Sequence, residues 1–226
     1  MADDPELGIR IPGPRFPERE HCYAVLLYLD DVADQRVCRI WDALDEHGTR
    51  PVRAAHGPEY RPHITLAIVE TARPEYVEQA LQPLLPRVRG LAVDLTAVGF
   101  FVNDQAPAFL AVSPTVGLVT LHHDVHLALD ALGPVAHDSW DYYRPGTWLP
   151  HCTLAMDADT PGTITSAVGS VADLPIRATV SYCRLEPLPD LLRTLRVYDG
   201  PPLHRAGPQH KAPRRRFLIG AGQGGR

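Results

Sequence analysis

A six-residue pattern occurs twice in this chain, each time at the start of an apolar run of strand length. The copies are Pro62–Ala67 (PHITLA) and Pro150–Ala155 (PHCTLA), 88 positions apart. The surrounding patterns repeat as well: apolar strands open at Cys22 and Pro107 and helices at Asp31 and Val116, both pairs 85 positions apart. A nearly constant offset over several elements indicates an internal duplication.

The two halves predict the same order of elements, strand, helix, strand, helix and hairpin. For the first half the pattern predicts strands over 22–29, 63–70 and 91–102 and helices over 31–47 and 74–88, the second broken near Pro83 and Pro86. For the second half it predicts strands over 108–113, 151–156, 176–185 and 192–198 and helices over 116–132 and 163–171. We therefore expect an α+β fold of two lobes related by a pseudo-twofold axis, each an antiparallel sheet with helices, around a central cleft.

The composition places this fold in a single globular domain. Of the 226 residues, 45% are apolar and 22% are charged, which is an ordinary globular balance. We expect an N-terminal extension over 1–20, one bilobal domain over 21–200 with lobes of about 21–105 and 106–200, and a disordered basic tail over 201–226.

Charge is distributed unevenly along the chain. The net charge is −5, but residues 201–226 hold six basic and no acidic side chains, which leaves −11 for residues 1–200. The body therefore has no broad basic surface, and we do not expect it to bind duplex DNA. A small anionic ligand in a local cleft remains compatible with this balance.

We expect neither a membrane protein nor a protein stabilised by disulfide bonds. No run approaches ~18 consecutive apolar residues, and the acidic, Pro-rich start of the chain is unlike a secretory signal. The four cysteines show no CxxC spacing, so we expect reduced thiols and no structural zinc. The chain is expected to be a cytoplasmic monomer.

The repeated pattern carries the chemistry. Side chains alternate along a strand, so His63 and Thr65 share one face while Ile64 and Leu66 take the other. His151 and Thr153 share a face in the second copy in the same way. Two imidazoles on either side of a cleft suit an in-line displacement at phosphorus, because one can take a proton while the other donates one. The two hydroxyls can donate hydrogen bonds to oxygens on the central atom.

These two HxTx motifs in a duplicated α+β plan resemble the two-histidine (2H) phosphoesterase superfamily. The similarity covers about residues 20–200, including YAVLLYLD and YRPHITL, and is greatest to the bacterial branch of 2′-5′ RNA ligases and RNA 2′,3′-cyclic phosphodiesterases. The resemblance implies a bilobal fold, no metal and no cofactor. It also implies that His63, Thr65, His151 and Thr153 are catalytic, with His151 as general base and His63 as general acid, although pseudo-symmetry allows the reverse.

The resemblance implies hydrolysis of 2′,3′-cyclic phosphates, on RNA ends or on small nucleotides, as the leading activity. Cleavage or formation of 2′-5′ phosphodiester bonds by the same four residues is a second possibility. The alternative outside the enzymes is a non-catalytic module that binds RNA or nucleotides. The completeness of both motifs argues against this alternative.

Long loops precede both motifs and contain aromatic and arginine side chains. Such side chains are suited to contact a nucleobase and phosphates. The candidates for substrate binding are Tyr60, Arg61, Tyr143, Arg144 and Trp148. The alternative is that the aromatic rings cap the cores and the arginines are solvated.

The segment His122–His126 (HHDVH) has two histidines at i and i+4, a spacing that zinc-binding helices use. The glutamate of that motif is absent, because His123 stands in its place. We therefore expect His122 and His126 to form a solvated or partly packed helix edge and not a metal site.

Overall fold

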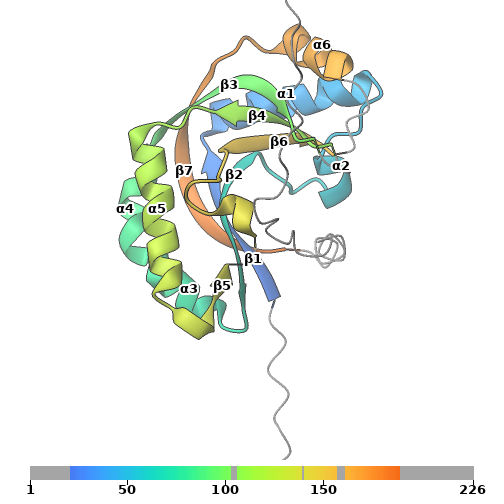
Figure 1. Ribbon diagram of the computed structural model, residues 1–226. Coiled ribbons are helices and arrows are strands. Elements are labelled where there is room, and N and C mark those ends of the chain that lie inside the picture. Colours follow the sequence, from blue (N-terminus) through green and yellow to red (C-terminus); the bar gives the residue numbers. More distant parts are fainter. Residues whose placement is uncertain (1–20, 103–105, 139, 157–160, 189–226) are drawn as a thin grey trace, which may run out of the picture. The chain divides into compact units, whose positions relative to one another are not determined.

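The structure is a computed structural model that describes residues 21–102, 106–138, 140–156 and 161–188 (Figure 1). The predicted extension over 1–20, the predicted strand over 192–198 and the predicted tail over 201–226 lie outside these residues. In the described part of the chain, no helix is long and apolar enough to cross a membrane.

The described strands form one antiparallel sheet, in which the spatial order of the strands differs from their order in the sequence. They are β1 (His21–Leu29), β2 (His63–Thr71), β3 (Ala92–Phe100), β4 (Ala108–Val112), β5 (His137–Asp138), β6 (His151–Ala155) and β7 (Ile176–Pro187). Their order in the sheet is β5-β2-β1-β7-β3-β4-β6. The twelve-residue β7 pairs with β1 through its second half and with β3 through its first half, so it joins the two sides of the sheet.

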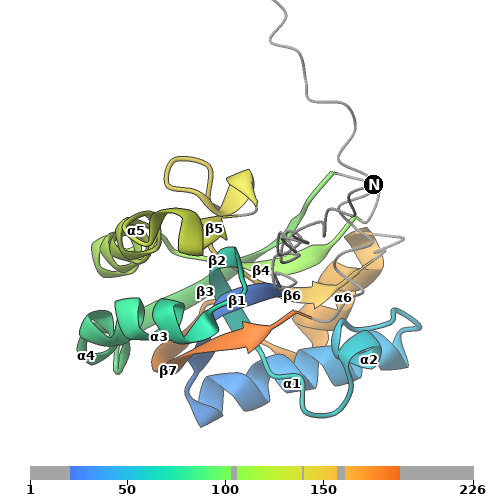
Figure 2. The same ribbon diagram turned by 90° about the horizontal axis from the view of Figure 1, so that it is seen from below.

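Helices lie in two groups around the strands (Figures 1 and 2). They are α1 (Asp31–Glu46), α2 (Arg53–His56), α3 (Pro74–Leu81), α4 (Leu85–Val88), α5 (Val116–Asp130) and α6 (Pro161–Val171). One group contains α3, α4 and α5, and α1 packs against α6 in the other. The predicted helix over 74–88 is interrupted by a 3₁₀ turn over Gln82–Leu84, because proline at 83 and 86 removes backbone donors.

The element order confirms the predicted α+β class and the duplication. The strand pair β1–β2 of the first half corresponds to β4–β6 of the second, and α1 and α3 correspond to α5 and α6. Contacts cross between the halves, since α1 packs on α6 and α3 packs on α5. The centre of the sheet likewise contains one strand from each half, β3 and β7, paired with each other.

The first helix shows how local sequence fixes an element in this fold. The Asp30 carboxylate accepts hydrogen bonds from the N–H groups of Val32 and Ala33, which caps α1. The same carboxylate accepts from the backbone N–H of Thr179 at 2.6 Å, so it also joins α1 to β7. Buried side chains along one side of the helix then enter the core: Ala33, Val37, Ile40, Trp41 and Leu44.

Candidate active site

The two HxTx motifs occupy β2 and β6 with the predicted alternation. His63 and Thr65 are partly exposed, whereas Ile64 and Leu66 are fully buried. In β6, His151 and Thr153 are partly exposed and Cys152 and Leu154 are buried. The apolar residues therefore anchor each strand in the core and leave the histidine and threonine on the opposite face.

Both histidines are oriented by the same hydrogen bond. Nδ1 of His63 donates to the carbonyl oxygen of Arg61 at 2.8 Å, and Nδ1 of His151 donates to that of Leu149 at 2.7 Å. Each acceptor lies two residues before its histidine. With the proton held on Nδ1, the Nε2 atom of each neutral ring is left with a lone pair that can take a proton.

The motif strands contact each other, although β2 and β6 are far apart in the strand order. The backbone N–H of His63 faces the Cys152 thiol, and the indole Nε1–H of Trp148, in the loop before β6, donates to the carbonyl oxygen of Thr65 at 3.0 Å. The two imidazoles are close enough to interact electrostatically. The structure thus brings the paired motifs to one place.

Both imidazoles favour their neutral form. Desolvation, together with a smaller effect of the nearby His151, lowers the pKa of His63 to about 4, although the hydrogen bond to Arg61 opposes this shift. Desolvation also lowers the pKa of His151 below its ordinary value. Two neutral imidazoles at pH 7 mean that one of them must acquire a proton before it can act as an acid.

Aromatic rings surround each histidine. Tyr60 meets His63 edge-on at 5.2 Å between ring centroids, and Tyr28 lies at 6.0 Å. Around His151, Phe101 lies at 5.1 Å, Phe109 at 5.2 Å and Tyr143 at 6.5 Å. These rings reduce the contact of the imidazoles with water, and this desolvation is the physical origin of the lowered pKa values.

One contact in this aromatic lining depends on a glycine. Gly99 in β3 lies opposite Phe109 in β4, and a Cβ atom at position 99 would overlap the Phe109 ring. The absence of a side chain at this position therefore lets the buried Phe109 ring lie beside His151.

The predicted helix edge at His122 and His126 is wrong, because the structure buries both rings, each with 2% exposure. Nε2 of His122 donates to the carbonyl oxygen of Tyr143 at 2.7 Å, and Nε2 of His126 donates to that of Leu66 at 3.2 Å. These contacts join α5 to β2 and to the loop before β6. The pair faces the protein interior because this side of α5 packs toward β2.

Of the predicted substrate-binding residues, three lie beside the motifs. Tyr60 contacts His63, the Tyr143 hydroxyl interacts with the Thr65 side chain, and Trp148 bonds the Thr65 carbonyl. The Arg61 guanidinium donates to Asp34 at 2.8 Å, so its charge is already paired with α1.

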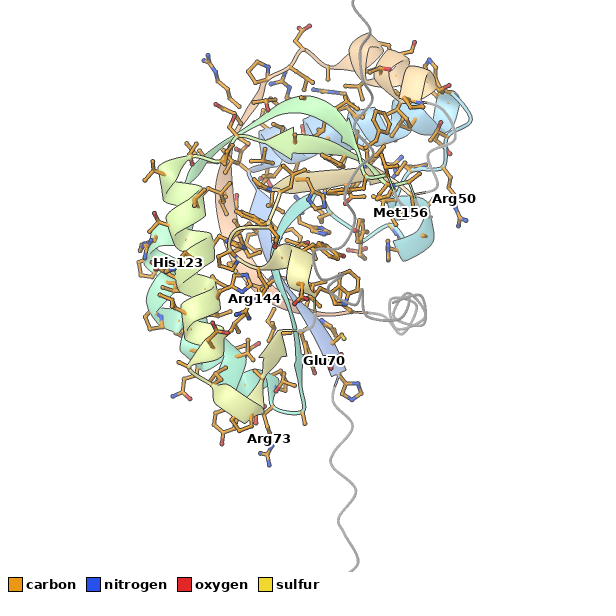
Figure 3. The ribbon with its side chains drawn as sticks, in the orientation of Figure 1. Arg50, Glu70, Arg73, His123, Arg144 and Met156 are labelled. Carbon is orange, nitrogen blue, oxygen red and sulfur yellow. The ribbon has the colours of Figure 1, made fainter. Side chains whose placement is uncertain are left out.

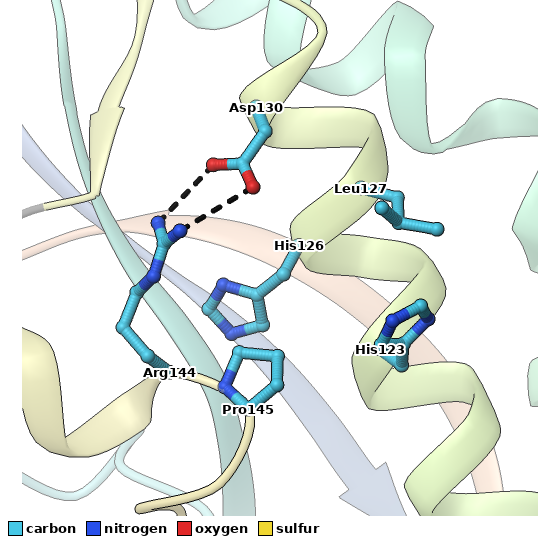
Figure 4. Close-up of a pocket in the computed structure, with 6 residues that line it drawn as sticks. All are labelled: His123, His126, Leu127, Asp130, Arg144 and Pro145. Atoms are coloured by element: carbon cyan, nitrogen blue, oxygen red, sulfur yellow. Dashed lines mark hydrogen bonds and ion pairs between the residues drawn. The ribbon is translucent and has the colours of Figure 1, made fainter.

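Arg144 points elsewhere, to Asp130 of α5, with which it makes two hydrogen bonds of 3.1 and 3.3 Å (Figures 3 and 4). This pair lines a cavity of about 180 Å³ together with His123, His126, Leu127 and Pro145.

Among the residues that the structure describes, no three or more His, Cys, Asp or Glu side chains come together in a group that could hold a metal ion. The side chains at the site that can act chemically are the two imidazoles and the hydroxyls of threonine and tyrosine.

The family model of the 2′-5′ RNA ligase superfamily matches residues 40–186, which include both HxTx motifs. The chain belongs to this superfamily. Its members are two-histidine phosphoesterases, and membership supports a phosphoesterase-type enzyme with an RNA-processing function. No curated protein matches the sequence.

Several solved structures are similar to this superfamily member. A crystal structure of E. coli LigT complexed with NADP+ has 19% identity and a TM-score of 0.45, covering 76% of this chain and 96% of that one. A phosphoesterase crystal structure has 20% identity and a TM-score of 0.45, with coverages of 75% and 96%. Kluyveromyces marxianus Usb1 has 16% identity and a TM-score of 0.40, with coverages of 76% and 100%.

Sequence reasoning missed four residues that the structure places around the motifs. Tyr28, Phe101 and Phe109 contact the imidazoles of the two motifs, and His122 supports the loop before β6. The three aromatic residues reach the motifs from other strands or loops, and no local sequence pattern specifies that pairing. His122 carried a signal in the HHDVH segment, but its surroundings depend on which side of α5 faces β2.

Proposed function

We propose that this protein is a metal-independent phosphodiesterase that opens 2′,3′-cyclic phosphates at RNA ends or on nucleotides. The observation that carries the proposal is the matched orientation of His63 and His151. Each donates Nδ1–H to a carbonyl two residues earlier and keeps Nε2 for proton transfer. A reaction that takes a proton from one oxygen and gives one to another needs two such groups.

In the proposed mechanism, the cyclic phosphate lies between the imidazoles. His151 takes a proton from a water molecule at Nε2 as the water oxygen forms a bond to phosphorus. The bond between phosphorus and one ribose oxygen breaks, and the protonated Nε2 of His63 gives its proton to that oxygen. The product is a ribose hydroxyl and a phosphomonoester, so protons and bonds balance. This choice of base and acid follows the family resemblance; pseudo-symmetry allows the reverse, in which His63, with its pKa of about 4, is the base and His151 is the acid.

The hydroxyls of Thr65 and Thr153 are proposed to donate hydrogen bonds to the non-bridging phosphate oxygens. Negative charge builds up on these oxygens as the water attacks, and donors fixed before the reaction stabilise it most effectively. The anionic substrate also raises the pKa of both imidazoles, because an opposite charge within about 4–6 Å favours the charged form. Binding the substrate therefore supplies the protonated imidazole that the free protein lacks at pH 7.

The test is hydrolysis of a 2′,3′-cyclic-phosphate-ended oligonucleotide and of 2′,3′-cyclic mononucleotides in excess EDTA. His63→Ala and His151→Ala should each lower kcat by about 10²–10⁴-fold. His123→Ala is the matched control, because this exposed histidine of α5 lies outside the site. Activity that disappears with EDTA, or that either histidine variant retains in full, would contradict the proposal.

The same assay should include a 2′-5′-linked dinucleotide. Cleavage of this substrate alone, again lost in both histidine variants, would assign the site to 2′-5′ phosphodiester bonds and replace the cyclic-phosphate proposal.

A further inference from the structure

A row of aromatic side chains extends from His63 across the sheet. Tyr28 of β1 is the register partner of His63 in β2 and of Tyr182 in β7, so the three side chains share one face. Ring centroids are 6.0 Å apart between His63 and Tyr28, and 4.8 Å apart between Tyr28 and Tyr182. The two tyrosine rings are stacked, with 25° between their planes.

Arg184 continues this row to the surface. It lies two residues after Tyr182 on β7, its guanidinium carbon is 5.0 Å from the centroid of the Tyr182 ring, and 64% of its side chain is exposed. On the other face of β7, Cys183 and Leu185 pack against the core and hold the strand in place. The row therefore begins at a proposed catalytic group and ends on an exposed guanidinium plane.

The carboxylate of Glu186, at the edge of the row, partly neutralises the positive charge of Arg184. Glu186 accepts a hydrogen bond from the Tyr28 hydroxyl at 3.3 Å and lies 3.8 Å from Arg184. The exposed end of the row thus offers a partly neutralised guanidinium packed over the Tyr182 ring, and not a concentrated positive charge. Such a surface is suited to stack a flat heterocycle, whereas binding a phosphate would favour an arginine without a carboxylate beside it.

We propose that Tyr182 and Arg184 form a subsite that stacks the nucleobase of the nucleotide adjacent to the reacting one, so that the enzyme prefers single-stranded RNA ends over cyclic mononucleotides. The inference rests on the proposed function, because the row gains this role from its contact with His63. Every base has a π face, so the subsite accepts any of the four bases. Recognition by stacking is also compatible with the negative charge of residues 1–200.

The experiment compares kcat/KM on a 2′,3′-cyclic-phosphate-ended tetranucleotide with kcat/KM on the 2′,3′-cyclic mononucleotide. Tyr182→Ala should lower the oligonucleotide value by about 5–100-fold, the range for loss of one base–aromatic stack, and leave the mononucleotide value unchanged. Tyr182→Phe, which keeps the ring, should behave as wild type. Arg177→Ala is the control, an exposed arginine near the other end of β7. An equal loss on both substrates, or no loss on either, would overturn the subsite.

A binding measurement separates this inference from the hydrolase proposal. Fluorescence anisotropy with a labelled tetranucleotide that ends in a plain 3′-phosphate needs no turnover. If wild type hydrolyses nothing but binds this probe, and Tyr182→Ala weakens binding, the hydrolase proposal fails and the subsite stands. If Tyr182→Ala binds the probe as tightly as wild type, the subsite fails.

Salt dependence tests the role given to Arg184. Stacking predicts that Arg184→Ala weakens probe binding without changing the slope of log affinity against log salt concentration. A slope reduced by about 0.7, the value for one lost contact to a single strand, would show that Arg184 binds a phosphate and would overturn its stacking role.

Discussion

The imidazole of His122 lies parallel to the indole of Trp148, with 3.8 Å between ring centroids and 2° between planes. The same indole donates from Nε1 to the carbonyl oxygen of Thr65, and the same imidazole donates from Nε2 to the carbonyl oxygen of Tyr143. A buried histidine on α5 is thereby connected to the first HxTx strand and to the loop before the second. We regard His122 as a positioning residue for the site.

This arrangement predicts different outcomes for two substitutions of His122. His122→Ala removes the stack and the hydrogen bond, and should lower kcat about 10–100-fold through displacement of the Thr65 strand, with a smaller change in KM. His122→Phe keeps the stack and should recover part of kcat.

Steady-state kinetics on the cyclic-phosphate substrate measures both variants, with His123→Ala as the exposed neighbour on the same helix. A purely structural role would lower the amount of folded protein without changing kcat per active site. An active-site titration or a folded-fraction measurement therefore has to accompany the kinetics, and an unchanged kcat in His122→Ala would refute the positioning role.

The lowered pKa values of the two imidazoles predict an acidic optimum for kcat/KM. This parameter reports the free enzyme, which needs one neutral and one protonated imidazole. Below about pH 4, the value for His63, both rings are protonated and no base remains. Above the pKa of His151, which is lowered from 6.5, both rings are neutral and no acid remains. The maximum should therefore lie below pH 6.5.

The pH profile of kcat should be displaced to higher pH, because it reports the complex in which the phosphate anion raises both pKa values. Initial rates from pH 4 to 9 at low and saturating substrate separate the two profiles. A maximum of kcat/KM above pH 7 would contradict the desolvated environment of the histidines.

Gly99 provides a third prediction, because a side chain at this position cannot share space with the Phe109 ring. Gly99→Ala should push the ring toward or away from His151, and lower kcat/KM about 10–100-fold. Adding Phe109→Leu makes room for the new methyl group and should restore part of the activity. Gly169→Ala on α6, where a Cβ meets nothing within 4 Å, is the matched control. Full activity in Gly99→Ala would show that Phe109 does not position His151.

Much of the fold could be predicted because its signals are local. Apolar runs of strand length located β2 and β6, and apolar residues along one side of a helix located α1. The paired motifs predicted that His63 and His151 lie near each other, and the structure places them on contacting strands. The aromatic environment of the site could not be predicted in the same way, because Tyr28 and Phe109 reach the motifs through strand register. Register between distant segments is set by the packing of the whole sheet and leaves no local pattern.

The Asp30 carboxylate makes the stability of this fold depend on pH. Burial opposes its ionisation, but hydrogen bonds from Thr179 and Ala33 outweigh this and lower the pKa below its ordinary value of 3.8. A carboxyl with a lowered folded-state pKa stabilises the fold above its unfolded value, and this contribution is lost as the pH falls through the folded value. Asp30→Ala should therefore lower the free energy of unfolding by about 1–3 kcal/mol at pH 7, since it removes a helix cap and leaves donors on two elements unpaired.

At pH 2.5, which is below the ordinary pKa of 3.8 that the carboxyl has in the unfolded chain, the stabilisation from the lowered pKa is smaller, so the difference between wild type and Asp30→Ala should shrink. Urea denaturation at pH 7 and at pH 2.5 measures this difference in the free energy of unfolding. The control is Asp45→Asn on the exposed side of α1, which should change stability by no more than about 0.5 kcal/mol. An equal difference at pH 7 and pH 2.5 would mean that the ionised carboxylate does not stabilise the junction between α1 and β7. A difference that shrinks only for Asp30→Ala would assign this part of the acid sensitivity to one carboxylate that holds a helix and a strand together.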